Sequence, residues 1–255
     1  MGGKDFGSQE VNWTVKGVTT PEVQSGTSID TTGKLTVAAN ETNEELIVRA
    51  TSKTDENLYA EKTIKTVLKY EDIPKVVPGS LDYVTIDGVK WFVLAKETGK
   101  ALIWSTDSIE NKEFDTANNS LWRDSSLRKY LNEDWINSKT ELKDKVAYTN
   151  IHTRIAGTDK FNTTKDRVFL LSEADLYGTH SYGQQNPDYR DYTYQGKQIP
   201  NVEALKLYPG NVYCWTRTQY NTRQIVIHYT TSTSYATANT TNSYGYRPAM
   251  WIEMP

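Results

Sequence analysis

Apolar and polar side chains alternate over short runs in the first part of the chain. The alternation is clear in residues 11–15 and briefer in residues 34–37, 46–50 and 62–67. A period of two residues is typical of β-strands that bury one face. Glycine, proline and asparagine separate the runs, as they do in the turns of antiparallel sheets. The pattern therefore predicts an all-β sandwich without helices.

A hairpin signal opens the second part of the chain. An Asp87-Gly88 turn lies between the apolar-rich residues 83–86 and 89–94, and residues 100–104 form another apolar run. Asp-Gly between two such runs favours a tight two-residue turn. We therefore expect a β-meander here.

Helical spacing follows this meander. Asp124 or Ser125 can cap a helix in which apolar residues recur as far as Ile136, and a further helical turn is expected over residues 139–146. Residues 167–171 have the continuous apolar pattern of a buried strand. Strands and short helices in this order predict an α+β domain.

Two stretches lack periodicity. Residues 70–80 carry two prolines and a glycine among charged residues, which is typical of a short, stiff linker. Residues 178–210 are rich in Gly, Pro, Gln, Asn and Tyr and predict a long loop. We therefore expect a first domain over residues 1–69, the linker over residues 70–80 and a second domain over residues 81–255.

Five pieces of the first domain occur together in a recognisable order. They are Val11-Asn12-Trp13-Thr14-Val15, residues 25–30, residues 32–37, Asn40-Glu41-Thr42 and residues 46–52. In combination they resemble a bacterial immunoglobulin-like domain of group 2, a type found in tandem on surface proteins and phage structural proteins. That family usually has another strand or two before the Trp-bearing strand, whereas ten residues precede Val11. The resemblance implies an immunoglobulin-like sandwich without its first strand, in a chain that is part of a longer protein.

The second domain carries a further set of motif pieces. They are residues 89–94, Leu121-Trp122, residues 125–132, residues 168–172, Trp215-Thr216-Arg217-Thr218 and residues 245–251. These resemble an uncharacterised family of bacterial and phage domains with a C-type-lectin-like fold, which is related in fold to formylglycine-generating enzymes. Thr216 stands where that family usually has an apolar residue. A polar residue at this position predicts an exposed side chain.

Residues 211–246 have an unusual composition. Tyr, Asn, Ser and Thr fill 22 of these 36 positions. Tyr supplies rigid contact area and Ser and Asn supply adaptable hydrogen bonds, a mixture that antibody paratopes favour. Thr and Tyr also suit ordinary exposed strands, so a plain sheet surface is the alternative interpretation.

The fold resemblance sharpens the first interpretation. Some lectin-fold proteins of phages and bacteria are targets of diversity-generating retroelements, which mutate adenines near the C-terminus of the gene. A Tyr/Thr/Ser/Asn-rich stretch that ends just before residues 245–251 resembles such a variable region, with differences between gene copies expected mainly over residues 215–244. The predicted ligand-binding residues are Thr216, Thr218, Gln219, Tyr220, Asn221, Thr222, Tyr229, Thr231, Thr233, Tyr235, Asn239, Asn242 and Tyr244.

The charge and hydropathy of the chain argue against two classes of partner, nucleic acids and membranes. Twenty-nine basic and 32 acidic residues give a formal charge of −3, so the chain lacks the basic surplus that holds a nucleic-acid backbone. No apolar run approaches the roughly 20 residues of a membrane-spanning helix, and the first residues lack the pattern of a signal peptide. We expect neither nucleic-acid binding nor membrane insertion. An extracellular, cell-surface or virion location is implied by the resemblances.

Catalytic and metal chemistry have few candidate residues. Cys214 is the only cysteine and can pair with His228 or His180, but a lone cysteine in a strand-like run is more often a small core residue. The related formylglycine-generating enzymes use two cysteines. Acids in residues 107–115, with Asp188 and Asp191, can supply oxygen ligands to calcium but match no EF-hand spacing. We therefore expect no catalytic residues, no metal site and no cofactor.

The sequence thus favours a non-enzymatic recognition or adhesion protein that binds a cell-surface protein or glycan. A purely structural module of a cell-wall or virion protein is the second hypothesis. An enzyme of the formylglycine-generating type is the third, and it requires Cys214 to be essential.

Overall fold

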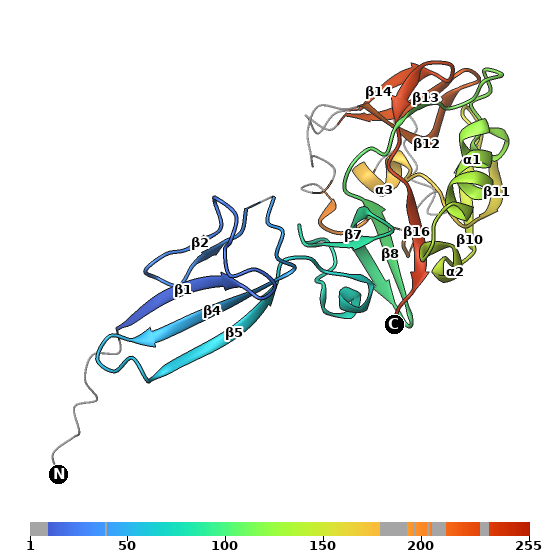
Figure 1. The fold of residues 1–255 in the computed structure, drawn as a ribbon. Helices are drawn as coiled ribbons and strands as arrows, with labels where there is room; N and C mark the ends of the chain where they lie inside the picture. The colour runs from blue at the N-terminus through green and yellow to red at the C-terminus, as the bar shows by residue number, and fades with distance from the viewer. Residues whose placement is uncertain are drawn as a thin grey trace, which may run out of the picture. The chain divides into compact units, whose positions relative to one another are not determined.

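The computed structural model describes residues 10–38, 40–178, 193–195, 197–202, 205, 213–229 and 235–255. The chain divides into two compact units, Met1–Leu68 and Lys69–Pro255, here called unit 1 and unit 2 (Figure 1). Within the described ranges, no helix is both long and apolar enough to span a membrane.

The described residues of unit 1 form strands and turns. One antiparallel sheet has the strand order β1-β4-β5, and β2 pairs with β3 in a separate short hairpin. The strands are β1 (Val11–Gly17), β2 (Ser28–Ile29), β3 (Leu35–Thr36), β4 (Glu45–Ser52) and β5 (Tyr59–Lys65). Each predicted strand of this part of the chain overlaps one of them, which confirms the period-two pattern.

Trp13 organises the packing of unit 1. It lies opposite Ala50 in the sheet, and its ring passes so close to Gly33 that a Cβ on that glycine would lie 2.8 Å from it. Gly33 also has a φ of +85°, a conformation that residues with a Cβ rarely adopt. Leu46 on β4 is completely buried. The hairpin of β2 and β3 is therefore held against the sheet by one tryptophan and one obligatory glycine.

Unit 2 begins with the predicted meander. Its first sheet has the order β16-β8-β7-β6, and the outer strand β16 comes from the end of the chain. Asp87 and Gly88 form the first turn with φ of +50° and +72°, as a tight hairpin with two left-handed residues requires. The strands are β6 (Tyr83–Ile86), β7 (Val89–Glu97), β8 (Lys100–Ser105) and β16 (Ala249–Glu253). Five consecutive residues of β7, from Trp91 to Ala95, are buried, so this sheet forms much of the core.

A second sheet carries the Tyr- and Thr-rich segment. Its order is β14-β13-β12-β15-β9, and β10 and β11 form a separate hairpin. The strands are β9 (Asn111–Glu113), β10 (Thr149–Arg154), β11 (Phe161–Asp166), β12 (Tyr213–Asn221), β13 (Gln224–Tyr229), β14 (Tyr235–Asn239) and β15 (Ser243–Gly245). Because β12 lies between β13 and β15, it is an inner strand of this sheet.

The helices of unit 2 whose bounds fall within the described residues are short. They are the 3₁₀ turns η1 (Tyr70–Lys75) and η2 (Trp122–Asp124), the α-helices α1 (Ser126–Tyr130), α2 (Leu142–Lys145) and α3 (Glu173–Tyr177), and a π-helical turn η3 (Leu131–Trp135). Ser125 caps α1 as predicted, because its hydroxyl accepts the Arg128 N–H. Ser172 and Asp175 form a capping box at α3. Strands and short helices together make unit 2 an α+β structure.

Residues 70–80 belong to unit 2 and do not form the separate, stiff linker that their proline content predicts. Ile73 is completely buried. The Lys96 ammonium donates to the carbonyls of Pro74 and Val76, at 2.9 and 2.6 Å. Proline and glycine content indicates local backbone behaviour only, whereas the contacts that fix this segment come from distant residues such as Lys96 on β7 and Glu253 on β16.

Candidate ligand-binding surface

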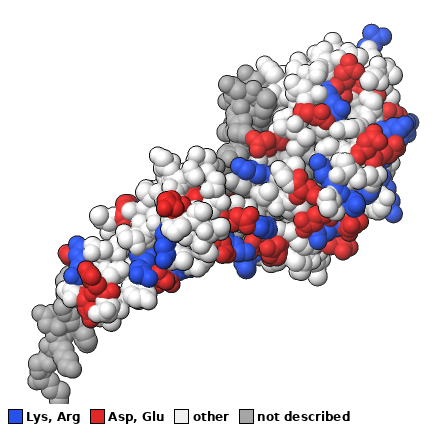
Figure 2. All heavy atoms as spheres, viewed as in Figure 1, with Lys and Arg blue, Asp and Glu red and all other residues white. Residues whose placement is uncertain are grey.

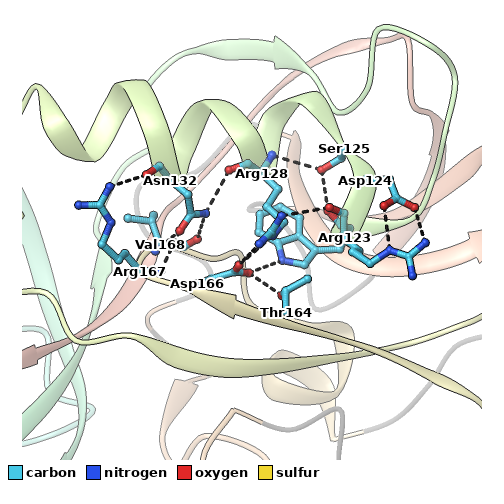
Figure 3. A network of polar contacts seen from close by, with 10 residues as sticks. Arg123, Asp124, Ser125, Arg128, Asn132, Thr164, Asp166, Arg167 and Val168 are labelled. Carbon is cyan, nitrogen blue, oxygen red and sulfur yellow. Dashed lines mark hydrogen bonds and ion pairs between the residues drawn. The ribbon is translucent and has the colours of Figure 1, made fainter.

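Side chains from the motifs within residues 121–132 contact one buried carboxylate, that of Asp166 (Figure 3). Asp166, at the end of β11, is completely buried. Its Oδ2 accepts hydrogen bonds from Trp122 Nε1 and Thr164 Oγ1, both at 2.8 Å. Arg128 donates from Nε to Oδ1 at 2.8 Å and places Nη2 2.6 Å from the same oxygen. These contacts fasten η2 and α1 to the β10–β11 hairpin.

Asn132, in the π-helical turn η3, also joins two separate segments of the chain (Figure 3). Its side-chain Oδ1 accepts the backbone N–H groups of Arg167 and Val168, and its Nδ2 donates to the Val168 carbonyl at 2.7 Å. The side-chain amide therefore pairs with residues 167–168 as a neighbouring strand would. Trp122, Arg128 and Asn132 therefore hold together the scaffold of this part of unit 2.

The arginines of the two C-terminal motifs are also buried. Arg217 donates to Asp175 Oδ2 at 2.9 Å and to the Leu170 carbonyl at 2.7 Å. The Arg247 guanidinium lies 3.3 Å from the Trp104 ring centroid and donates to the Ser105 carbonyl. Both arginines therefore connect separate segments of the chain within the core.

Three predicted binding residues on β12 lie in the interior. Thr216 is 1 % exposed, and Thr218 and Gln219 are also buried. Thr218 Oγ1 accepts the Glu173 N–H, and Gln219 Oε1 accepts the Ala156 N–H. The prediction that Thr216 is exposed is wrong, because the inner strand β12 is covered on both faces from Cys214 to Gln219.

Six predicted residues reach the surface, and most of them gather at two turns. Asn221, Thr222, Asn239 and Asn242 are exposed, and Tyr220 and Tyr244 are half-buried. The turn at residues 222–223 and the turn at residues 240–242 are joined by a hydrogen bond from Thr240 N–H to the Arg223 carbonyl. We call them the paired turns.

Four further predicted residues cannot be placed in this surface. Tyr229 ends β13 and Tyr235 begins β14, but their side chains lie outside the described part of the structure. Thr231 and Thr233 lie outside the described residues altogether. The same holds for Asp188, Asp191 and His180.

Two tyrosines form an aromatic surface beside the paired turns. The Tyr244 ring lies 5.5 Å from the Tyr213 ring and 5.1 Å from the Trp215 ring, measured between centroids. Tyr213 is 42 % exposed, whereas Trp215 is buried and donates its Nε1–H to the Lys112 carbonyl at 2.8 Å. Asn242 Nδ2 lies 3.5 Å from the Tyr244 hydroxyl, which connects the paired turns to the aromatic surface, defined here as Tyr213 and Tyr244.

The residue-level prediction missed Tyr213. Tyr213 and Trp215 are two positions apart on β12, so their side chains share a face of the strand. That alternation was available in the sequence. The contact with Tyr244 was not, because it depends on the pairing of β15 with β12 at Gly245 and Cys214.

A pocket of about 290 Å³ adjoins Lys112, which lies opposite Tyr244 in the β15–β9 pair. The lining residues are Lys112, Glu113, Thr116, Ser126, Leu127 and Tyr130. We call it the β9–α1 pocket.

A small polar cluster fixes one wall of this pocket. The Lys112 ammonium lies 4.1 Å from the Tyr130 ring centroid and 3.7 Å from Glu110 Oε1. The same oxygen accepts the hydroxyls of Tyr130 and Tyr246, at 2.9 and 2.8 Å. Burial raises the pKa of Glu110, but the hydrogen bonds from Tyr246 and Tyr130 and the charge of Lys112 outweigh it, so the pKa lies below its ordinary value. The ionised carboxylate of Glu110 therefore holds the side chains of Tyr130, Tyr246 and Lys112 in place.

The cysteine has the environment of a core residue. Cys214 lies opposite His228 in the β12–β13 pair, and its side chain is 2 % exposed. Burial raises the pKa of its thiol to about 11, so the nucleophilic thiolate is scarce at neutral pH.

Charges of both signs alternate over the face of unit 2 seen in Figure 2. That face offers no continuous basic patch for a nucleic-acid backbone. The described residues include no group of three or more His, Cys, Asp or Glu side chains placed to hold a metal ion.

Comparison with protein families gives one match. Residues 98–254 match the family described as "Domain of unknown function (DUF6273)". The matched range covers the Asp166 network, the second sheet, the aromatic surface and the β9–α1 pocket. Comparison with curated proteins and with solved structures gave no match.

Proposed function

The chain belongs to the DUF6273 family, and we propose that its second unit is a non-enzymatic binding domain. The observation that carries this proposal is the aromatic surface. The rings of Tyr213 and Tyr244 lie at the surface of the second sheet. The buried residues of that sheet are held in place by hydrogen bonds and an ion pair. Exposed tyrosines on a rigid support are typical of recognition surfaces.

The support under these rings lowers the entropic cost of binding. Trp215 contacts Tyr244 on one side and Phe114 on the other, with centroids 5.1 and 5.7 Å apart. Its indole N–H is also held by the Lys112 carbonyl. Groups that are ordered before binding lose less freedom when the ligand arrives. The paired turns add Asn and Thr side chains, which can adapt their hydrogen bonds to different ligands.

We assign finer fold identities as part of the same proposal. Unit 1 is an immunoglobulin-like spacer domain, which its sheet of β1, β4 and β5 with the covering hairpin of β2 and β3 supports. Unit 2 is a C-type-lectin-like domain, which the combination of two sheets with short helices supports. The parent protein is extracellular, on a cell surface or in a virion, and its ligand is a cell-surface protein or glycan.

Retroelement diversification of the surface also belongs to this proposal. The buried positions narrow the residues that can vary without damage to the core. Thr216, Thr218 and Gln219 hold internal hydrogen bonds, whereas Thr222 and Asn239 are exposed. Variation that changes specificity is therefore expected at the paired turns and the aromatic surface.

The test is retention of the full chain on intact bacterial cells and on immobilised glycans. We expect the double substitution Tyr213→Ser and Tyr244→Ser to lower retention at least about tenfold, as the loss of hot-spot aromatics does elsewhere. Tyr148→Ser is the matched control, because Tyr148 is 62 % exposed and belongs neither to the paired turns nor to the aromatic surface. Wild-type retention by the double variant, with its circular dichroism unchanged, would favour the alternative of a structural module.

A further inference from the structure

We infer that the β9–α1 pocket is a subsite for one neutral sugar residue of a glycan. This inference rests on the proposed binding function and names the class of ligand that this part of unit 2 takes. It concerns residues on β9 and α1, outside the Tyr- and Thr-rich segment.

The charges of the pocket select against ionic ligands. Lys112 and Glu113 both line it, and Glu110 lies 3.7 Å from the Lys112 ammonium. An anionic ligand would meet Glu113 and a cationic ligand would meet Lys112, so a ligand of either charge faces one repulsive contact. A neutral ligand that both donates and accepts hydrogen bonds can use both side chains.

The hydroxyl groups of the pocket complement a polyol. Ser126 Oγ accepts the Thr116 N–H at 3.2 Å, which leaves the Ser126 hydroxyl proton to donate to a ligand. Glu113 also lines the pocket, and its carboxylate accepts hydrogen bonds. Adjacent hydroxyls of a sugar ring offer both roles within one molecule. Tyr130, which is half-buried and lines the pocket, supplies the apolar ring surface that the C–H face of a pyranose requires.

The pocket is fixed before a ligand arrives. The Leu127 N–H donates to the Phe114 carbonyl at 3.1 Å. Ser125 holds α1 at its N-terminus, and the Arg128–Asp166 pair holds it at its middle. The volume of about 290 Å³ lies at the small end of ligand pockets. It suits one ring and its ordered water better than an extended chain.

The register of the sheet connects this pocket to the aromatic surface. Tyr244 on β15 lies directly opposite Lys112 on β9, and opposite residues of an antiparallel pair project from the same face. A glycan bound across the aromatic surface can therefore place a neighbouring sugar residue in the pocket. This arrangement makes the ligand of the proposed function a glycan.

The experiment is an NMR titration of the isotope-labelled full chain with methyl α-glucoside, methyl β-galactoside and N-acetylglucosamine. We expect shifts of the amides of residues 112–116 and 126–130 by at least one of the three sugars at about 100 mM, well above a millimolar Kd. Glucuronate and glucosamine, the charged probes, should bind about tenfold more weakly than that neutral sugar. Absence of shifts in these segments with all three, or stronger binding of a charged probe, would overturn the inference.

Matched variants separate this subsite from the aromatic surface. Thr116→Val and Ser126→Ala remove one hydroxyl each, and each should weaken binding of the sugar about fivefold to tenfold. Glu113→Gln should bring glucuronate to within about twofold of the neutral sugar. The Tyr213→Ser, Tyr244→Ser double variant should retain monosaccharide binding in the pocket even where retention on glycans is lost. Monosaccharide binding that survives both hydroxyl variants would place the sugar elsewhere, whatever the outcome for the aromatic surface.

Discussion

Arg217 and Asp175 form an ion pair with both side chains removed from solvent. The guanidinium Nη1 lies 2.9 Å from Asp175 Oδ2, and the two side chains are 1 % and 0 % exposed. Asp175 also accepts the Ser172 N–H in the capping box of α3 and the N–H and hydroxyl of Thr193. One carboxylate thus connects the inner strand β12 to α3 and to residue 193.

The first prediction is that Arg217→Met destabilises unit 2 severely. Removing one partner of a buried pair leaves the other charge without compensation, which costs about 3–5 kcal/mol. Urea unfolding followed by tryptophan fluorescence measures this, because six of the seven tryptophans belong to unit 2. The matched control is Arg123→Gln, which breaks an exposed pair with Asp124 and should hardly move the midpoint. Similar midpoints for the two variants would mean that the buried pair adds nothing to stability.

The second prediction concerns a helix cap supplied by a hairpin turn. Asp87 accepts the backbone N–H groups of Thr140, Glu141 and Leu142 at 2.8–3.1 Å, so it caps α2 from the β6–β7 turn. Asp87→Ala should cost about 1–2 kcal/mol, because it removes the cap and places alanine at a positive φ. Asp87→Asn keeps one acceptor and tolerates that φ, so it should cost less than half as much in the same urea assay. Equal losses in the two variants would assign the effect to the charge of Asp87 and not to the cap.

Local signals explain which parts of the fold the sequence predicts. The Asp87-Gly88 turn, the serine cap at Ser125 and the alternation in residues 11–15 each depend on residues close together in the chain, and each is present. The errors arise where distant segments meet. Thr216 is buried because β12 is covered on both faces, where β10, α3 and η2 pack against it. No local pattern of β12 can indicate these distant partners.

The candidate surface was predictable to a similar degree. Composition indicated Tyr244 and the residues of the paired turns, because Tyr, Asn and Thr are enriched there. The β9–α1 pocket was not predictable, because it forms only when β9 pairs with β15 and α1 packs beside it. Lys112 and Tyr130 are ordinary residues in the sequence and acquire their roles from this nonlocal arrangement.

The third prediction is a pH dependence that involves Glu110. A carboxyl group whose folded pKa is depressed stabilises the fold above its unfolded value, here 4.5, and this contribution disappears as the pH falls through the folded pKa. Glu110→Gln should therefore lower Tm more at about pH 7 than at about pH 3. Scanning calorimetry of both proteins at the two pH values checks the sign. Glu133→Gln, at an exposed glutamate of η3, is the control for the loss of one negative charge, and an equal pH effect in that variant would contradict a specific role for Glu110.

The fourth prediction is that Cys214 is unreactive in the folded chain. Its pKa is raised to about 11 and its side chain is buried, so a disulfide reagent at neutral pH should modify it only as fast as the protein opens. The rate should rise to that of a free thiol in concentrated guanidinium chloride. Fast labelling of the native chain would show a reactive thiol and revive the third hypothesis, an enzyme that needs this cysteine.

The fifth prediction concerns natural variation in the gene. Deep sequencing of the source population should show substitutions concentrated in adenine-bearing codons for exposed residues such as Asn221, Thr222, Asn239 and Asn242. Codons for Thr216 and Thr218 should change less, because their side chains hold hydrogen bonds inside unit 2. Substitutions spread evenly along the reading frame would contradict diversification and would leave a fixed binding surface.

The pairing of β16 with β8 has a consequence for synthesis on the ribosome. Residues 100–105 of β8 have one neighbour, β7, as soon as the meander emerges, but the other is residues 249–253. The isolated β-bridge between Phe169 and Ala249 also cannot form until residues 249–253 have been synthesised. The first sheet therefore keeps an open edge until nearly all of unit 2 has left the exit tunnel, a period in which unpaired edges invite wrong partners. The described strands of unit 1 all lie within residues 11–65, so that unit can fold while unit 2 is still being made.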